Sequence, residues 1–540
     1  MRKGLCRVLA AVLLACLLLT GCKQKTGGGA FGFTLTAEPR QIDPQVATDT
    51  ASLSVIDAVY EGLARLDDDG RVVPAAADWT VSADGRTYTF TLRESYWSTV
   101  KVRGEKTGFE EPVQVIAADF VFGIRRVADP TTGSPYAAQL TDIENADKVL
   151  SGKAPLTEFG VEAVDERTLV IRLAEPNADF PEKLTTPAFM PCNREFFGST
   201  GGRYGLEMRY ILTNGPFSMS AWTHNTAVSL KKNEHYHAAD SILPAAVKYR
   251  ISTDAEEDFE LLEKGYIDGA AVPQDGLERA AAAGIRLEEL QDTVRYLWMN
   301  TAAPPLSEPK IRQALRDAME WNALWDSLGA GCAPATGFVP PDATAGGARY
   351  REQAAKVPLH TDPTAAQTAL ANGLAALELQ KLPTLTLLAA DDAESANLAR
   401  YILQSFTKNL SITCTLELVD AETLAARVRA GNYQLAIFDV TGTGFTAKEN
   451  LSVFTTDAVG NYARFSAAAY DALYAQAGAD RAAAQGLEQW LYDACPALPL
   501  GFCTRYYGVL AEDSGILVRP FNGGAFGALL SFRTADKVTS

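Results

Sequence analysis

Alternating apolar and polar residues predict short, half-buried β-strands in the first third of the chain. The alternation is clearest over residues 87–92, where every second side chain is apolar. Two further apolar runs, 161–163 and 169–173, flank a polar turn. Their spacing predicts a β-hairpin.

Apolar residues at helical spacing predict amphipathic helices later in the chain. Over residues 311–319 they recur at i, i+3, i+4, i+7 and i+8, which places them on one helix face. Thr253 and Glu256 have the spacing of a capping box. We therefore expect a helix that starts there and ends at Gly265.

The most regular order of elements lies between residues 384 and 445. Strand-like and helix-like segments alternate there, as strand 384–388, helix 394–406, strand 412–418, helix 422–429 and strand 433–438. This alternation predicts βαβ units on a mostly parallel sheet, and hence an α/β fold. Ligands of such sheets bind beyond the carboxyl ends of the strands.

The segment that leaves the last of these strands is a candidate ligand site. Its glycines allow close approach to the backbone, and its hydroxyl groups can exchange hydrogen bonds with a ligand. The alternative is a simple turn after a strand, but we favour ligand binding. The segment consists of Asp439, Val440, Thr441, Gly442, Thr443, Gly444 and Phe445.

The N-terminus predicts export and attachment to a lipid. A basic start precedes the apolar run 8–19, which is too short to be a stable membrane-spanning helix. The run closes with Leu19-Thr20-Gly21-Cys22, which resembles the bacterial lipobox. We interpret residues 1–21 as a lipoprotein signal peptide, with Cys22 lipidated and 22–29 as a tether. A plain signal peptide with an incidental cysteine is the alternative.

Composition excludes several classes of protein. The 540 residues suffice for two to four domains, and 47% apolar and 21% charged residues describe a globular chain. The mean hydropathy of −0.05 excludes a polytopic membrane protein. Acidic residues outnumber basic ones 66 to 49, so a nucleic-acid partner is not expected.

Candidate chemistry is sparse, which favours binding over catalysis. The pair His235 and His237 is expected to be solvated or partly packed, since no acid or further histidine completes a site. No nucleophile, zinc or phosphate motif occurs in the sequence. We predict a protein that is not an enzyme and has no catalytic residues, metal site or cofactor.

The cysteines of the mature chain leave their pairing open. They show no metal-binding spacing and are Cys192, Cys332, Cys414, Cys495 and Cys503. A bridge between Cys495 and Cys503 is possible outside the cell. Such cysteines are more often small buried apolar residues, which is the interpretation we favour.

Many short motifs follow one another in a characteristic order along the chain. They are Tyr60–Leu63, Asp67–Gly70, Pro74–Trp79, Ser82–Gly85, Thr87–Arg93, Ala118–Val121, Arg125-Arg126, Asp129-Pro130, Thr213–Phe217, Lys232–Tyr236, Gly265–Asp268, Met299-Asn300 and Ile311–Leu315. Their order resembles that of family 5 extracellular solute-binding proteins, the oligopeptide- and dipeptide-binding components of ABC importers. The resemblance is dense from residue 34 to about 330. We expect most of the motif residues to be structural.

The resemblance implies a two-lobed, periplasmic-binding-protein-like fold (type II, cluster C) with a hinge, an interlobe cleft and an inserted domain. Lobe I would comprise 30–74, 205–296 and 500–540, the inserted subdomain 75–204, and lobe II 297–499. Ligand-facing backbone would come from Ala51, Ser52, Leu53 and Ser54, and from the strand end in lobe II.

One departure from the family pattern concerns the cargo. The aspartate that pairs with a peptide's α-amino group in oligopeptide binders would fall within Thr443 to Phe445, where no acid occurs. Because a buried ammonium group needs a partner, peptides held in that way are disfavoured, and oligosaccharides or metal chelates gain weight. Trp298 and Phe445 are candidates for a cleft wall, with core packing as the alternative for Trp298.

The expected function is that of a monomeric, extracytoplasmic receptor anchored to the bacterial cell membrane by lipid at Cys22. It would capture a peptide or another small solute and deliver it to ABC permease subunits with a cytoplasmic ATPase. A sensor or surface-interaction lipoprotein with a degenerate cleft is the alternative. A secreted hydrolase is a third hypothesis, for which the sequence offers no site.

Overall fold

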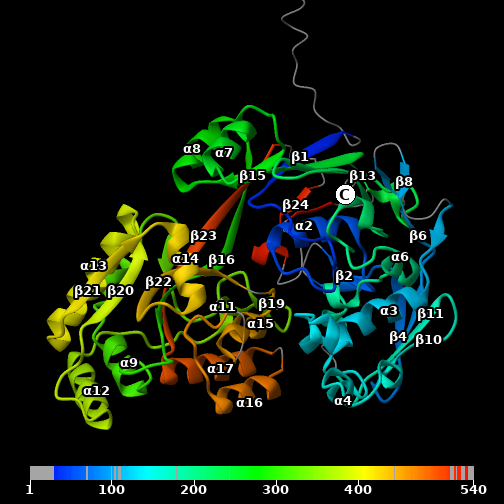
Figure 1. Cartoon of the computed structure of the whole chain (residues 1–540). Coiled ribbons are helices and arrows are strands. Elements are labelled where there is room, and N and C mark those ends of the chain that lie inside the picture. The colour runs from blue at the N-terminus through cyan, green and yellow to red at the C-terminus, as the bar shows by residue number, and fades with distance from the viewer. Residues whose placement is uncertain are drawn as a thin grey trace, which may run out of the picture.

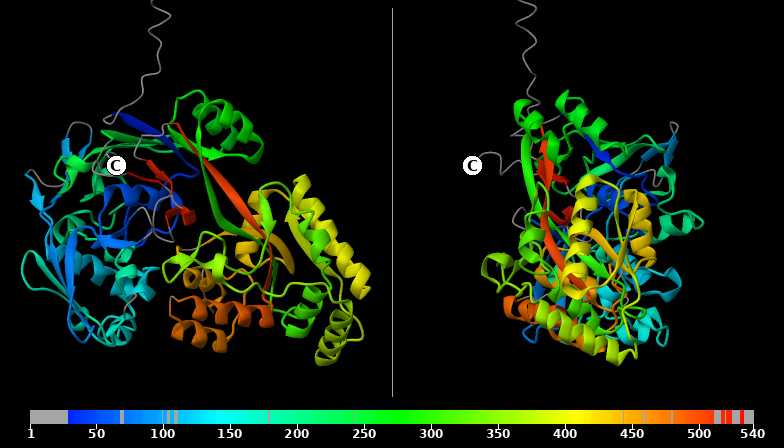
Figure 2. Two further views of the ribbon diagram at one scale, coloured as in Figure 1. Left: turned by 180° about the vertical axis from the view of Figure 1, so that it is seen from behind. Right: turned by 90° about the vertical axis from the view of Figure 1, so that its left-hand side faces the viewer.

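Two bodies joined by two long strands make up the molecule (Figure 1, Figure 2). The connecting strands are β16 (Arg286–Met299) and β23 (Ala497–Val509), which pair antiparallel to each other. This computed structural model describes residues 29–510, 516–518, 520–523 and 530–532, except 68–70, 99, 103–104, 108–110, 178–179, 243, 443, 457, 459 and 479. The predicted signal peptide, most of the tether and Cys22 lie outside the described residues.

The first body contains two four-stranded sheets. One has the order β1 (Ala30–Leu35), β14 (Ala246–Ile251), β13 (Ala227–Lys232) and β12 (Phe217–Thr223), with β1 parallel to β14. The other has the order β10 (Val161–Ala163), β11 (Thr168–Arg172), β5 (Thr87–Leu92) and β4 (Ala77–Val81). The predicted strand and the predicted hairpin are both confirmed, as β5 and as β10 with β11.

The second body is built on a seven-stranded mixed sheet. Along one path its order is β15 (Gly269–Val272), β23, β16, β22 (Leu435–Thr441), β20 (Leu385–Ala390) and β21 (Cys414–Val419), and β17 (Cys332–Pro334) also pairs with β23. Strand β20 runs parallel to both β21 and β22, with α13 (Ala393–Leu410) and α14 (Ala421–Ala430) as the crossovers. The predicted βαβ units are confirmed. The expectation of a mostly parallel sheet is wrong, because β22 pairs antiparallel with β16, and β15, β16 and β17 all pair antiparallel with β23.

Two large apolar cores correspond to the two bodies. The first core joins buried side chains from residues 31 to 249 with Tyr507 and Val509. The second core joins those from 294 to 502 with Phe521. The segment 75–204, predicted as an inserted subdomain, therefore shares one core with the chain on either side of it. A small separate cluster lies between residues 259 and 285.

Two local predictions need correction. Helix α7 (Ala255–Glu263) is capped by Asp254, whose side chain accepts from the Glu257 amide at 2.9 Å, so the cap lies one residue after Thr253. The predicted helix over 311–319 is observed as α9 (Pro309–Asp317), with Glu308 as its N-cap. Aspartate is a better N-cap than threonine, which agrees with a helix that starts one residue later than the spacing predicted.

The bridge between Cys495 and Cys503, which the sequence left open, is not formed. Cys503 is joined to Cys332, which lies directly opposite it where β17 pairs with β23. Cys495 is a free, buried residue at the C-terminal end of α17 (Arg481–Ala494). The pairing depends on the strand register between segments 171 residues apart, which spacing in the sequence does not reveal.

Within the described part of the chain, no helix combines the length and the apolar character needed to cross a bilayer.

Candidate functional site

The carboxyl end of β22 lies beside the connecting strand β16. Thr441 is opposite Thr293 in the antiparallel register, and their hydroxyl oxygens are 3.1 Å apart. The side chains of Asp439, Val440 and Thr441 are half-buried. Thr443 lies outside the described residues. The strand end thus combines threonine hydroxyl groups with backbone at the junction of the two bodies.

The two glycines of this segment are in close contact with the protein itself. A Cβ atom at Gly442 would lie 1.9 Å from Asn450 Oδ1 and 2.6 Å from Phe521 Cδ1. A Cβ atom at Gly444 would lie 2.4 Å from Glu449 Oε2. Both Glu449 and Asn450 belong to the short helix α15 (Ala447–Leu451). The close approach that we expected from a ligand is made here by neighbouring side chains.

Asp439 is engaged by an arginine of the connecting strand. Arg295 donates to it in a bidentate pair, with Nε to Oδ1 at 2.8 Å and Nη2 to Oδ2 at 3.0 Å. Arg295 also donates from Nη1 to Glu394 Oε1 at 2.6 Å. The side chain of Arg295 is 13% exposed and that of Asp439 38% exposed. The carboxylate that could have replaced the missing aspartate is therefore already hydrogen-bonded on both oxygens to Arg295.

The early candidate segment is the first half of helix α2 (Thr50–Val59). Its N-cap Asp49 accepts from the Ser52 amide through its side chain and from the Leu53 amide through its carbonyl. The buried Ser52 hydroxyl oxygen accepts from the amides of Arg40 at 2.9 Å and Gln41 at 3.2 Å.

The other candidate residues of this segment differ in burial. Ala51 and Leu53 are buried, and Ser54 is half-buried with its hydroxyl donating to the carbonyl of Thr50. The solute-facing role of 51–54 stays a prediction.

The two aromatic candidates differ in their surroundings. Trp298 is fully buried, donates from Nε1 to the Phe438 carbonyl at 3.1 Å and stacks on Phe454, which supports core packing. Phe445 is half-buried and makes an edge-to-face contact with Phe521, with ring centroids 5.8 Å apart.

Two residues at this strand end were missed by the sequence analysis. Asp292 and Phe521 both contact the Gly442 segment, although they lie far from it in the sequence. Asp292 was detectable only as an acid within an otherwise strand-like run. Phe521 carried no local signal.

His237 is part of a packed network that includes an acid, whereas His235 is exposed. His237 Nε2 lies 2.7 Å from Oε2 of the buried Glu61, and Tyr236 donates its hydroxyl to Oε1 of the same carboxylate. Glu61 and Asn214 exchange backbone and side-chain hydrogen bonds. All four residues lie in or next to the family-like motifs, and here they hold segments of the first body together.

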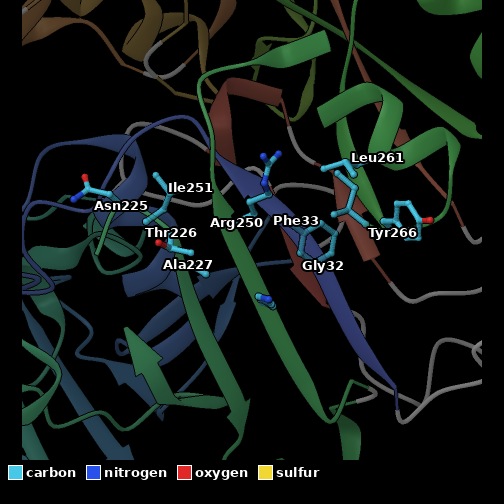
Figure 3. Close-up of a pocket in the computed structure, with 11 residues that line it drawn as sticks. Gly32, Phe33, Asn225, Thr226, Ala227, Arg250, Ile251, Leu261 and Tyr266 are labelled. Carbon is cyan, nitrogen blue, oxygen red and sulfur yellow. The ribbon is translucent and has the colours of Figure 1, made fainter. Parts of the chain in front are cut away.

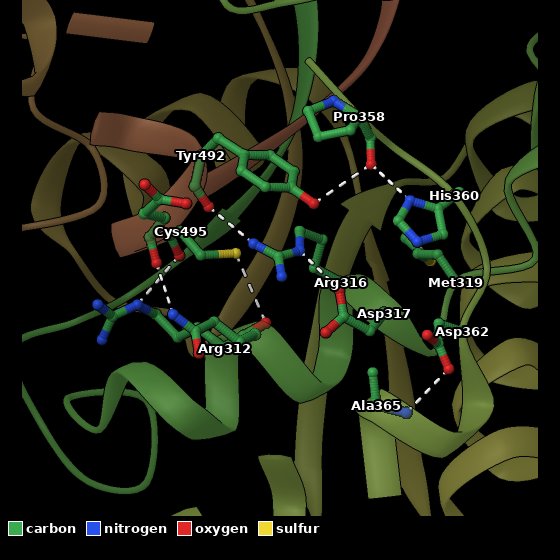
Figure 4. Close-up of polar contacts among 12 residues, drawn as sticks. Arg312, Arg316, Asp317, Met319, Pro358, His360, Asp362, Ala365, Tyr492 and Cys495 are labelled. Carbon is green, nitrogen blue, oxygen red and sulfur yellow. Dashed lines mark hydrogen bonds and ion pairs between the residues drawn. The ribbon is translucent and has the colours of Figure 1, made fainter. Parts of the chain in front are cut away.

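Arg312, in the motif Ile311–Leu315, is also structural (Figure 4). Its guanidinium group is buried and donates to the carbonyls of Ala494 and Cys495, which end helix α17, and to that of Leu306. A cation is favourable at this end of a helix because the last carbonyl groups are otherwise unpaired. Burial lowers the pKa of Arg312.

A surface cavity of about 430 Å³ lies in the first body, where β1, β13 and β14 meet α7 (Figure 3). Tyr266, which is 75% exposed, lies at its edge. Arg250 lines the cavity, but Glu257 and Asp258 already pair with its guanidinium group. None of the predicted site residues lines this cavity.

Over the residues that the structure describes, no group of three or more His, Cys, Asp and Glu side chains is placed to hold a metal ion.

Comparison with known proteins identifies the family. A family model described as "Bacterial extracellular solute-binding proteins, family 5 Middle" matches residues 71–462. The chain is 28% identical to the dipeptide-binding protein of Lactococcus lactis subsp. cremoris over 87% of its own length and 86% of that protein. It is 26% identical to the oligopeptide-binding protein OppA of Bacillus subtilis, over 77% of this chain and 75% of that one.

The fold agrees with solved structures of the same kind. The structure of Listeria monocytogenes OppA bound to peptide superposes with a TM-score of 0.73 at 24% identity, covering 94% of this chain and 99% of that one. This likeness shows the two-lobed type II binding-protein fold that the motifs implied. Together with the match of the family model, it identifies the chain as a member of the bacterial extracellular solute-binding proteins of family 5.

Proposed function

We propose that this protein is an extracytoplasmic, lipid-anchored receptor of an ABC importer. It captures a peptide or a related small solute between its two lobes and delivers it to the membrane permease, without catalysing a reaction. The observation that carries the proposal is the family match over residues 71–462, supported by the names of the relatives as dipeptide- and oligopeptide-binding proteins. The N-terminal lipobox pattern supports the anchor at Cys22.

The proposed solute-facing residues are those of the β22 end, Asp439 to Phe445, and the early segment 51–54. At the β22 end the available groups are threonine hydroxyls and backbone rather than a free carboxylate. Since both oxygens of Asp439 are bonded by Arg295, a solute held there needs no ammonium group to pair with this carboxylate. Peptides are then bound through their backbone, and blocked peptides bind as well as free ones.

The test begins with native mass spectrometry of the purified mature protein for a co-purifying solute. A thermal-shift panel follows, with free peptides, N-acetylated peptides, oligosaccharides and metal chelates. A solute at a hundredfold excess over its Kd stabilises the folded state by about 2.7 kcal/mol. If no member of the panel shifts the melting temperature, the receptor role is wrong and the sensor with a degenerate cleft is favoured.

A matched pair of variants locates the site. Thr441→Val removes the hydroxyl next to Thr293 without changing shape, and should weaken solute binding about fivefold if that hydroxyl bonds the solute. The control Thr415→Val breaks an equivalent threonine pair, with Thr386, on the neighbouring strands β20 and β21. Equal affinities in both variants would place the site elsewhere.

A second variant tests the amine. Asp439→Asn should leave the ratio of affinities for free and N-acetylated peptides within about twofold of the wild-type ratio, because Arg295 already engages this carboxylate. A strong loss of preference for the free amine in the variant would show that Asp439 anchors it.

The anchor is tested separately. Cys22→Ser should release the protein from the membrane fraction or leave it as an unprocessed precursor. A variant that fractionates with membranes as the wild type does would contradict lipidation at Cys22.

A further inference from the structure

We propose that the turn at 520–523 is a third connection between the two lobes, a latch that restricts their opening about a hinge at Asp292. The latch consists of Phe521 and the neighbouring residues of this turn. It follows β24 (Ile516–Val518) and precedes β25 (Leu530–Phe532), which pair with each other. The inference depends on the two-lobed fold and not on which solute binds.

The pairing of β16 with β23 is irregular at two positions, between Leu290 and Thr293 and between Arg295 and Tyr296. At the first, Gln291 and Asp292 lie outside the ladder, opposite the segment between Arg505 and Cys503, which is a β-bulge. Bulges bend a strand and increase its local twist, so each is a position where the two strands can flex together. We place the hinge at the first, because Asp292 also binds the end of β22 and the C-terminal turn.

Asp292 connects the hinge to two other parts of the chain. Its side chain is fully buried and accepts from Arg505 Nε at 2.9 Å and from the Phe521 amide at 2.7 Å. Its carbonyl accepts from the Gly442 amide at 2.8 Å. One residue of the hinge thus binds the end of β22 and the C-terminal turn at the same time.

Phe521 places its ring in the second core. The residue is 2% exposed, its ring lies against the backbone of Gly442, and it contacts Phe445 edge to face. Val518, three residues earlier, packs against the first core. Only two residues, 519 and 520, therefore lie between a contact in one lobe and a contact in the other.

The backbone of Phe521 is also in an uncommon conformation. Its φ of 58° lies in the left-handed region, which residues other than glycine adopt only at a free-energy cost. The hydrogen bond to Asp292 and the burial of the ring hold it there. Rotation of the lobes about Asp292 would draw the ring away from Gly442 and Phe445, so opening requires the latch to be released.

The test compares two variants of the mature protein without added solute. Phe521→Gly removes the ring while favouring the observed φ, so the backbone of the turn is not strained. The control Phe406→Leu reduces a fully buried ring of α13 that lies within the second core. Small-angle scattering measures the radius of gyration, and hydrogen exchange measures the protection of the Gly442 amide.

The latch predicts that Phe521→Gly increases the radius of gyration and speeds exchange at Gly442 by about tenfold or more. Phe406→Leu should lower the melting temperature and leave both of these measurements as in the wild type. Unchanged scattering and unchanged exchange in Phe521→Gly would overturn the proposal and leave Phe521 as an ordinary core residue.

Hydrogen exchange of the wild type tests the latch even if Phe521→Gly does not fold. A latch that opens as one unit exposes the amides of Phe521 and Gly442 together, so their exchange should report the same opening free energy. The Ile437 amide, further inside β22, should exchange more slowly. Different opening free energies for Phe521 and Gly442 would contradict the latch.

Discussion

The two segments predicted to face the solute are held in place in different ways. Residues 51–54 begin a helix, and their partners lie nearby in the sequence; the bond from the Arg40 amide to Ser52 spans 12 residues. The end of β22 depends on distant partners, because Arg295 is 144 residues from Asp439. The bond between Phe521 and Asp292, which borders Gly442, spans 229 residues.

This difference determines how each segment responds to substitution. The helix segment depends on its own neighbours, so removing one group affects one or two local bonds. The strand end is an assembly of β16, β22, α15 and the C-terminal turn, so a larger side chain there displaces several of them. Function at the strand end is therefore best tested by changes that keep shape, such as Thr441→Val.

The largest effect on stability is expected from the disulfide between Cys332 and Cys503, which lies next to the end of β22. Cys503 pairs in register with Thr293, which in turn pairs with Thr441. Because the bridge closes a loop of 171 residues, replacing Cys332 and Cys503 by serine should lower the free energy of unfolding by about 3–5 kcal/mol. Denaturant titration measures this, with Cys414→Ala as the control. A loss below about 1 kcal/mol would contradict it.

Gly442→Val should destabilise the protein by about 3 kcal/mol or more. The structure leaves no room for a side chain at this position between Asn450 and Phe521. Gly486→Ala in α17 is the control, since a Cβ atom there meets nothing within 4 Å, and alanine favours a helix. If thermal unfolding of Gly442→Val matches the wild type, the contacts of the strand end do not hold in solution.

Ser52→Ala should cost about 1–2 kcal/mol, because the amides of Arg40 and Gln41 lose their acceptor inside the protein. Ser54→Ala is the local control, since its hydroxyl donates only to the Thr50 carbonyl of its own helix and is half exposed to solvent. Urea unfolding of the two variants should differ by at least about 1 kcal/mol. Equal stabilities would show that the cap around α2 is unimportant.

The smallest expected effect is a pH dependence of stability at the end of β22, where Glu449 lies against Gly444. Burial raises the pKa of Glu449, while its bonds from Thr446 oppose the rise. A carboxyl group whose pKa is raised in the folded state stabilises that state when the pH is below its ordinary pKa of 4.5. This contribution is lost as the pH rises through the pKa of the folded state. The wild type should therefore lose more stability than Glu449→Gln as the pH rises from 4.5.

Melting temperatures over this range measure the difference. The control Glu422→Gln changes an exposed residue in the first turn of α14 and should keep the slope of the wild type. A Glu449→Gln variant with the same slope as the wild type would show that this carboxyl does not titrate with a raised pKa.

The sequence by itself determined the local elements and the family. The alternation of apolar and polar residues predicted β5 and the hairpin of β10 and β11. The alternation of strand-like and helix-like segments predicted the parallel strands β20, β21 and β22. These patterns are visible because they record which face of each element is buried. The order of motifs identified the family, although residues such as Arg312 and Glu61 are structural in this protein.

Only the tertiary structure decided what surrounds the candidate site. The partner of Cys503, the ion pair of Arg295 with Asp439, and the meeting of Asp292, Gly442 and Phe521 all join residues far apart in the chain. Their side chains carry no periodic signal, since each contact depends on strand register and on the packing of one lobe against the other. The glycines at 442 and 444 were visible in the sequence, but what approaches them was set by the fold.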